Sequence, residues 1–391
     1  MLTMKKHAII PVFIPHKGCP NDCVFCNQKA ITARTADIKP EDVKKLIDDY
    51  LPTLQGRDLE TIEVAFFGGS FTGIPLEEQS AFLEVAADYK ARGLIDKIHM
   101  STRPDYIDET ILDNLKKYDA DIIELGVQSF HPEVLKASNR GHSAEDVYKA
   151  CDLIKSYGFE LGIQLMIGLP EDSLKRCLYS VRETVKIAPS VARLYPTIVL
   201  NDTELLRMYQ RGEYSPLTTD EAVAITKEMY RILDDAGINI IRVGLKSTDL
   251  ITEGGEIRGH TFHPAFRQLV EGELAKEQLE EQLTELLQGS AESPEVHERL
   301  DFRSSGNSFS NMVGNSRRNK NYFAEKYPDL RIKYKVDHSL ADGRYIVVKS
   351  EIKNMHRRRR FIDTGGQNES SYYGNRKRYG RHTGQSEHDM R

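Results

Sequence analysis

Up to about residue 250 the chain alternates short apolar runs with longer segments of mixed apolar and charged residues. The apolar runs are continuous, as expected for parallel strands that are buried on both faces. The intervening segments carry helical signals, such as Ser143 before AEDVYKACDLIKSYG, where apolar residues recur at helical spacing and Gly158 marks the end. Strands are predicted at HAIIPVFI (7–14), IEVAFFGG (62–69), KIHMST (97–102), DIIELGVQ (121–128), ELGIQLMIG (160–168), ARLYPTIVL (192–200) and INIIRVGL (238–245), the last being the weakest pattern.

Repeated strand–helix units of this size imply a parallel α/β sheet, either open or curled into a barrel. Beyond residue 250 the pattern changes to a loop, a long charged helix and a small α+β unit with a turn at Asp342-Gly343. From about Asn354 the chain is polar and rich in Gly, Ser, Arg and Tyr, so we expect disorder there. The predicted domains are a core (1–250), an accessory α+β domain (251–352) and a basic tail (353–391).

The composition, 39% hydrophobic and 29% charged over 391 residues, is that of an ordinary soluble globular protein. No stretch approaches the ~20 apolar residues needed to cross a bilayer, so we expect no membrane span. The first apolar run is interrupted by Pro11 and Pro15, which favours a buried strand over a signal peptide. A cytoplasmic location is therefore expected.

Charge is distributed unevenly along the chain. The segment 353–391 carries ten Lys and Arg against four Asp and Glu, a local net charge of +6, although the whole chain carries -5. A basic tail on an acidic body suggests an anionic partner, with RNA the obvious candidate. The alternative is a solvated tail that only aids solubility.

Three of the five cysteines, Cys19, Cys23 and Cys26, lie within eight residues, directly after the first predicted strand. Thiolates are the usual ligands of iron–sulfur clusters. Three protein ligands on a four-iron cluster leave one iron open, as a reactive cluster requires. The alternative is a structural zinc site completed by His16. Cys151 and Cys177 fall inside amphipathic helical patterns and are expected to be small core residues.

This cysteine spacing resembles the defining motif of the radical S-adenosylmethionine (SAM) superfamily, and the chain is similar within it to the catalytic subunit of the Elongator complex. The resemblance covers roughly residues 5 to 248. It implies a partial (β/α)6 TIM-like barrel, a [4Fe-4S] cluster on the three cysteines, and an enzyme that cleaves S-adenosyl-L-methionine reductively to a 5′-deoxyadenosyl radical. The landmarks that carry it are GGSFTG (68–73), STRPDY (101–106), ELGVQSF (124–130), NRGHSAEDV (139–147), IGLPED (167–172), LYPTIVLNDTEL (194–205) and GEYSPLTTDEAV (212–223).

The resemblance also implies a SAM site at the ends of the strands. Gly68, Gly69 and Ser70 would receive the methionine amino group, and Arg140 would pair with the carboxylate. Ser101, Gln128 and Ser129 would face the barrel mouth near ribose and carboxylate, although Gln128 and Ser129 could equally be strand-end caps. Gln164 and Leu169 would lie against adenine. The alternative is that this region is only the ordinary end of the strand before the next helix.

Two departures limit what the family resemblance implies. The Elongator relatives have a longer first cysteine interval, and nothing after residue 250 resembles their acetyltransferase domain. Basic and aromatic residues are interleaved in GNSRRNKNYFAEKYPDLRIKYK (314–335) and in the tail, a combination suited to RNA. We therefore predict action on tRNA, of the wobble-uridine modification type, with electrons from a reductase, flavodoxin or ferredoxin. The alternatives are a radical SAM enzyme acting on a small molecule, as coproporphyrinogen dehydrogenase does, and a non-catalytic zinc-bearing RNA-binding adaptor.

Overall fold

The computed structural model of the chain describes residues 7–14, 19, 23–27, 38–245, 257–288 and 299–350. The chain divides into two units, Met1–Ser350 and Glu351–Arg391, and every described residue lies in the first. The predicted basic tail therefore falls outside the described residues, and the predicted domain boundary at residue 250 stays a prediction. None of the described helices combines the length and the apolar character that a bilayer crossing requires.

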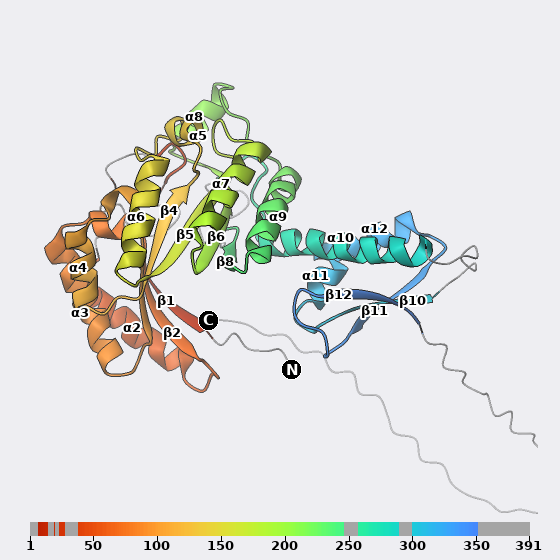
Figure 1. Cartoon of the computed structure of the whole chain (residues 1–391), viewed down its shortest axis with the longest axis horizontal. Helices are drawn as coiled ribbons and strands as arrows, with labels where there is room; N and C mark the ends of the chain where they lie inside the picture. The colour runs from red at the N-terminus through yellow and green to blue at the C-terminus, as the bar shows by residue number, and fades with distance from the viewer. Residues whose placement is uncertain are drawn as a thin grey trace, which may run out of the picture. The chain divides into compact units, whose positions relative to one another are not determined.

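A parallel sheet of seven strands forms the core of the first unit, with the strands in chain order β1-β2-β3-β4-β5-β6-β8. Its two end strands do not pair with each other, so the sheet is the open, partial barrel that the sequence predicted. Figure 1 shows the curved sheet with its helices along one side. The strands are β1 (His7–Ile14), β2 (Thr61–Gly68), β3 (Lys97–Thr102), β4 (Ile122–Gln128), β5 (Glu160–Ile167), β6 (Val191–Pro196) and β8 (Asn239–Val243).

Most of the connecting helices bury an apolar stripe against the sheet, because they carry apolar residues at helical spacing. Their starts follow from local chemistry: Ser143 and Thr218 each accept a hydrogen bond from the third backbone amide of the helix that follows, in complete capping boxes. The helices are α2 (Pro40–Leu54), α3 (Leu76–Ala91), α4 (Glu109–Lys117), α5 (Pro132–Ala137), α6 (Ala144–Ser156), α7 (Leu174–Ile187), α8 (Glu204–Gln210) and α9 (Thr219–Asp235), with short 3-10 turns at Phe71–Gly73 and Pro104–Tyr106.

The two faces of the sheet differ in chemistry, although both are buried. The helix-facing positions are apolar, for example Val64, Ile98 and Leu194. The alternate positions, which share the inner face, include Glu63, His99, Ser101, Glu124 and Arg193. The sequence analysis expected continuously apolar strands that are buried on both faces. The structure confirms the burial, but several side chains of the inner face are polar or charged. These polar positions line the side of the sheet that the helices leave open.

The predicted strand 192–200 is two strands in the structure. β6 ends at Pro196, which lacks the N–H that would continue the ladder, and β7 (Val199–Leu200) then pairs antiparallel with β9 (Ile257–Arg258). Apolar residues continue through both pieces, so the hydrophobic pattern alone could not show the break.

The C-terminal region follows the long charged helix α10 (Phe266–Gln288) and is the expected small α+β unit, with one strand, two short helices and two further strands. Its three-stranded sheet has β10 (Arg299–Ser304) in the centre, parallel to β11 (Arg331–Val336) and antiparallel to β12 (Tyr345–Lys349). A second apolar core joins this sheet to α10, α11 (Phe309–Val313) and α12 (Arg318–Lys326) through residues such as Leu279, Phe302 and Phe323.

Candidate functional site

The cysteine segment leaves the C-terminal end of β1, on the same edge of the sheet as the other strand ends. The amide of Cys26 bonds to the carbonyl of Cys23 at 2.9 Å, which makes a tight turn between these two cysteines. Val24 holds the turn in place, because its amide bonds to the Ser138 carbonyl at 3.2 Å and its carbonyl accepts from the Leu205 amide at 2.7 Å. The predicted cysteine loop is therefore anchored to two later segments of the chain.

The three cysteines differ in exposure: Cys23 is buried, Cys26 is half-buried and Cys19 is exposed, and none forms a disulfide. Over the described residues, no three His, Cys, Asp or Glu side chains stand close enough together to hold a metal ion. The structure thus places the three sulfurs on one short loop without drawing them into one cluster. His16, the fourth ligand of the zinc alternative, lies outside the described residues.

Arg140 links the cysteine loop to the sheet. Its Nη1 donates to Sγ of Cys23 at 3.1 Å, and its Nη2 donates to the Gly126 carbonyl at 2.5 Å. Arg103, after β3, donates to the Arg140 carbonyl at 2.6 Å and forms a two-pronged pair with Asp105. Two buried guanidinium groups therefore adjoin the predicted cluster ligands.

The pKa values of Arg103 and His142 are shifted by their charged and buried surroundings. Burial acts to lower the pKa of Arg103, but the Asp105 pair and then the sulfurs of Cys23 and Cys19 raise it above its usual value. Burial, with Arg140 and Arg103 next, lowers the pKa of His142 to about 4. His142 is therefore neutral near pH 7. Thiols are the usual ligands of an iron–sulfur cluster, and this loop carries three of them. The two fixed cations beside the loop suit the negative charge of such a cluster.

Gly68 and Gly69 bring the end of β2 against the end of β1. Gly68 has φ +113°, and a Cβ there would stand 2.5 Å from the Ile14 carbonyl oxygen, so only glycine fits. The Gly69 amide bonds to that same carbonyl at 2.9 Å. Ser70 Oγ bonds to Thr102 Oγ1 at 2.8 Å and accepts from the Arg103 amide at 3.2 Å, which joins this turn to the end of β3.

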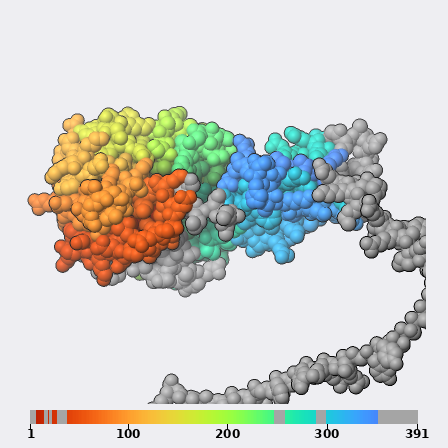
Figure 2. Space-filling model, turned by 90° about the horizontal axis from the view of Figure 1, so that it is seen from below, coloured from red at the N-terminus to blue at the C-terminus, as the bar shows by residue number. Residues whose placement is uncertain are grey.

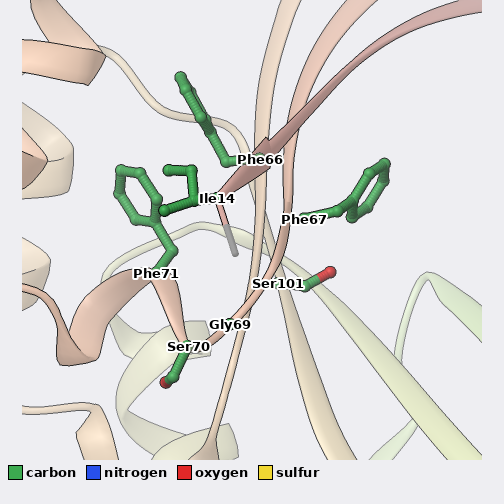
Figure 3. A pocket seen from close by; sticks show the side chains of 7 residues that line it. All are labelled: Ile14, Phe66, Phe67, Gly69, Ser70, Phe71 and Ser101. Carbon is green, nitrogen blue, oxygen red and sulfur yellow. The ribbon is translucent and has the colours of Figure 1, made fainter. Parts of the chain in front are cut away.

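Figure 3 shows how side chains alternate around this turn: Phe67 and Ser101 point to one side of the strands, and Ile14, Phe66 and Phe71 lie on the other. A small hollow is lined by these five residues with Gly69 and Ser70. Ser101 therefore belongs to the polar inner face, and its Oγ donates to Glu124 Oε1 at 3.2 Å.

Gln128 ends β4 in a left-handed backbone conformation, with φ +69°, at a shift in the register between β4 and β5. Such a conformation is costly for a residue with a Cβ and is found preferentially at functional sites. Gln164 Nε2 donates to Gln128 Oε1 at 3.3 Å, so two predicted SAM contacts meet across the strands. Ser129 instead bonds to Ser180 of α7 at 3.2 Å and to the His131 amide, the arrangement expected of a strand-end cap.

A cavity of about 220 Å³ lies at the end of β5, beside the predicted adenine contact Leu169. Leu169 is buried, and Tyr214 closes this region by donating its hydroxyl to the Gly168 carbonyl at 2.6 Å. Leu217 packs so tightly on Gly168 that a Cβ there would meet it at 2.7 Å. The GEYSPL segment thus contributes walls of this cavity that no strand-end reasoning had identified.

The inner face also holds a row of neighbouring ionisable side chains that the sequence analysis did not identify. Glu63 lies 3.0 Å from His7 Nε2 and 2.6 Å from His99 Nδ1, and Glu124 Oε2 lies 3.7 Å from His99 Nε2. Arg193 Nε approaches Glu124 Oε2 to 2.7 Å, as an ion pair that is not aligned as a hydrogen bond. A single charged residue inside each of several otherwise apolar strands was the available signal.

Comparisons with known proteins show which family and which relatives the chain resembles. The family model "Radical SAM superfamily" matches residues 13–179, and "Radical_SAM C-terminal domain" matches residues 189–276. A tRNA uridine(34) acetyltransferase of Methanocaldococcus infernus is 28% identical over 297 residues, which cover 63% of this chain and 55% of that protein. Human Elongator complex protein 3 is 24% identical over 296 residues, 62% of this chain and 54% of that protein.

The chain therefore spans about half the length of these curated relatives. A solved structure of archaeal Methanocaldococcus infernus Elp3 with an N-terminal deletion superposes with a TM-score of 0.50 at 24% identity, covering 63% of this chain and 61% of that one. This likeness shows the fold, the curled parallel sheet with its helices.

Proposed function

The chain belongs to the radical SAM superfamily, and we propose that it is an enzyme that holds a [4Fe-4S] cluster on Cys19, Cys23 and Cys26, cleaves S-adenosyl-L-methionine reductively and acts on tRNA. The observation that carries the proposal is the pair of hydrogen bonds from Arg140, one to the Cys23 sulfur and one to the Gly126 carbonyl. This arginine connects the thiols that would hold the cluster to the strand end that would hold SAM.

When bound, the cluster and SAM would supply one electron and a 5′-deoxyadenosyl radical that removes a hydrogen atom from the substrate. The residues of the chain would place and shield these groups. Gly68 allows the backbone to approach closely, and Arg140 offers a fixed cation for a carboxylate. Gln128 and Gln164 present amide groups at the mouth of the sheet.

The cavity beside Leu169 supports the adenine end of the proposed SAM site. Buried Leu169 and partly buried Leu217 give it apolar walls, while the Gly168 carbonyl and amide are bonded to Tyr214 and Asp172. Glu171, Asp172 and Glu213 also line the cavity, so the proposed contact with adenine is the apolar one through Leu169 and Leu217. We assign Ser129 to the packing between β4 and α7 rather than to SAM, because its hydroxyl is already bonded there.

The proposal of tRNA as substrate rests on the relatives, whose names specify tRNA uridine and the Elongator complex. The basic C-terminal segments are the part of the sequence suited to RNA. Because the chain matches only about half of each relative, we propose only the radical step, on a wobble-type uridine. The electron donor would be a reductase, flavodoxin or ferredoxin.

The test is anaerobic incubation of the reconstituted protein with SAM and a reductant, first alone and then with total tRNA. We expect four irons with sulfide and no zinc, production of 5′-deoxyadenosine, and an altered uridine in digested tRNA by mass spectrometry. Bound zinc without deoxyadenosine would contradict the enzyme assignment. Deoxyadenosine formation with unchanged nucleosides would leave the radical chemistry standing and overturn tRNA as the substrate.

A further inference from the structure

The C-terminal sheet has one covered face and one open face. Leu300, Phe302 and Val347 point toward α10, α11 and α12 and belong to the apolar core there. Figure 1 shows α10 and α12 on one side of this sheet, and within the described residues no helix packs on the other side. In Figure 2, the blue residues, which form the last part of the described chain, lie at the surface in the view from below.

The open face is basic where β10 and β11 lie, and Ile346 and Val348 of β12 complete it. The strand pairing places Arg299 beside Arg331, Asp301 beside Lys333, and Arg303 beside Lys335, so all six share one face. Five cations and one carboxylate give this face a local net charge of +4. We call Arg299, Arg303, Arg331, Lys333 and Lys335 the basic sheet face.

Asp301 forms ion pairs with two of these cations and not with the other three. It is buried and pairs with Lys335 at 2.5 Å and with Arg303 at 3.2 Å. Burial acts to raise the pKa of Asp301, but hydrogen bonds from Lys335, Ser350 and Arg303 lower it below its usual value. Among the described residues, exposed Arg299, Arg331 and Lys333 lie in no ion pair.

The shape of the face indicates which part of a nucleic acid it fits. The aromatic residues of the sheet, Phe302, Tyr334 and Tyr345, lie on the covered face or in its core, so none is available for stacking on bases. The open face instead offers cations on alternate residues, about 6.6 Å apart along each strand. Cations without aromatic platforms recognise phosphates and carry little sequence preference.

We propose that the basic sheet face is the docking surface for the phosphate backbone of a folded tRNA. This inference rests on the proposed function and deepens it by locating the substrate's contact. The opposite charges of the face and of RNA carry the argument, since the chain's own tail, at +6, would be repelled from this face.

The test is fluorescence anisotropy of the full-length protein with labelled tRNA at several NaCl concentrations. The variant is Arg299→Gln/Arg331→Gln/Lys333→Gln, which removes the three cations that lie in no ion pair and leaves the Asp301 pairs intact. We expect at least tenfold weaker binding at 100 mM salt and a log–log salt slope smaller by about 2 to 3. The matched control is Lys44→Gln/Lys45→Gln/Lys149→Gln, three exposed lysines of α2 and α6 that lose the same charge.

Each outcome bears on the proposal. Loss of affinity in the sheet variant with wild-type binding by the control supports it. Equal weakening by both triple variants would mean that only net charge matters, and an unchanged sheet variant would mean that RNA binds elsewhere; either overturns the docking surface while tRNA remains the substrate. A wild-type protein that binds no RNA overturns both proposals. Binding of polyglutamate, but not tRNA, through this face would identify an acidic protein partner and overturn it as well.

Discussion

The Nη1 atom of Arg140 lies 3.1 Å from the Sγ atom of Cys23, although 117 positions separate the two residues in the chain. Arg140 follows α5, and Cys23 follows β1, so this contact exists only because the parallel sheet brings its strand ends to one edge.

Cys23→Ala is expected to abolish 5′-deoxyadenosine production and to reduce bound iron, because it removes the buried thiol of the proposed cluster. The fold should persist, as judged by circular dichroism, because the cysteine segment lies outside the main apolar core. Cys151→Ala is the control, since this buried thiol of α6 lies outside the site. Normal deoxyadenosine formation by the Cys23 variant would overturn the cluster assignment.

Arg140→Lys is expected to weaken SAM binding by about tenfold to a hundredfold, since an ammonium cannot replace the two-pronged geometry of a guanidinium. Anaerobic calorimetry with SAM measures the dissociation constant directly. Exposed Arg182 of α7 gives the control Arg182→Lys, which should bind SAM like the wild type. Equal affinities for all three proteins would remove Arg140 from the proposed SAM site.

Glu63 predicts a dependence of stability on pH. Burial acts to raise its pKa, but hydrogen bonds from His7 and His99 lower it to about 2 from 4.5. A lowered folded-state pKa stabilises the protein above pH 4.5, and this contribution, up to ~3 kcal/mol, is lost as the pH falls from 4.5 towards 2. Urea unfolding at pH 6 and pH 3.5 should show a smaller drop in the free energy of unfolding for Glu63→Gln. An identical drop in both proteins would assign the acid sensitivity to other groups.

Gly68→Ala is expected to destabilise the protein by about 3 kcal/mol or more, because the new Cβ meets the Ile14 carbonyl and the backbone is left-handed. Gly93→Ala is a matched control, with φ +67° and no atom within 4 Å of the added Cβ, and should cost only about 1 kcal/mol. Denaturant midpoints compare the two variants. Equal costs would show that the β1–β2 approach can relax.

Truncation before Asn354 is expected to weaken tRNA binding and to lower its salt dependence, because residues 354–391 carry nine Lys and Arg against four Asp and Glu. Anisotropy titrations of the truncated and full-length chains at several salt concentrations measure both quantities. A salt slope unchanged by the truncation would leave solubility as the role of the tail.

Much of the architecture could be predicted from the sequence because the signals are local. Apolar runs identified the strands of the parallel sheet, and Ser143 marked its helix start through its own side chain. The break at Pro196 escaped prediction because β7 is defined by pairing with β9, which lies 57 residues downstream of Leu200 at its nearer end.

The candidate site was likewise predictable from the sequence only in part. The cysteine spacing and the glycine turn could be read from consecutive residues, and the structure places Gln128 beside Gln164 and Arg140 beside Cys23. Two further features could not be predicted from the sequence: the cavity wall formed by Tyr214 and the hydrogen bond between Ser129 and Ser180. Each depends on which distant segment packs against the strand end.

The sequence by itself therefore determined most strands and helices of the parallel sheet and the cysteine motif. Tertiary structure alone decided that Glu63, His99, Glu124 and Arg193 meet on one buried face, and that five cations of β10 and β11 share one open face. The physical reason is that strand alternation sets which side each residue takes, whereas only the register between strands sets which residues become neighbours.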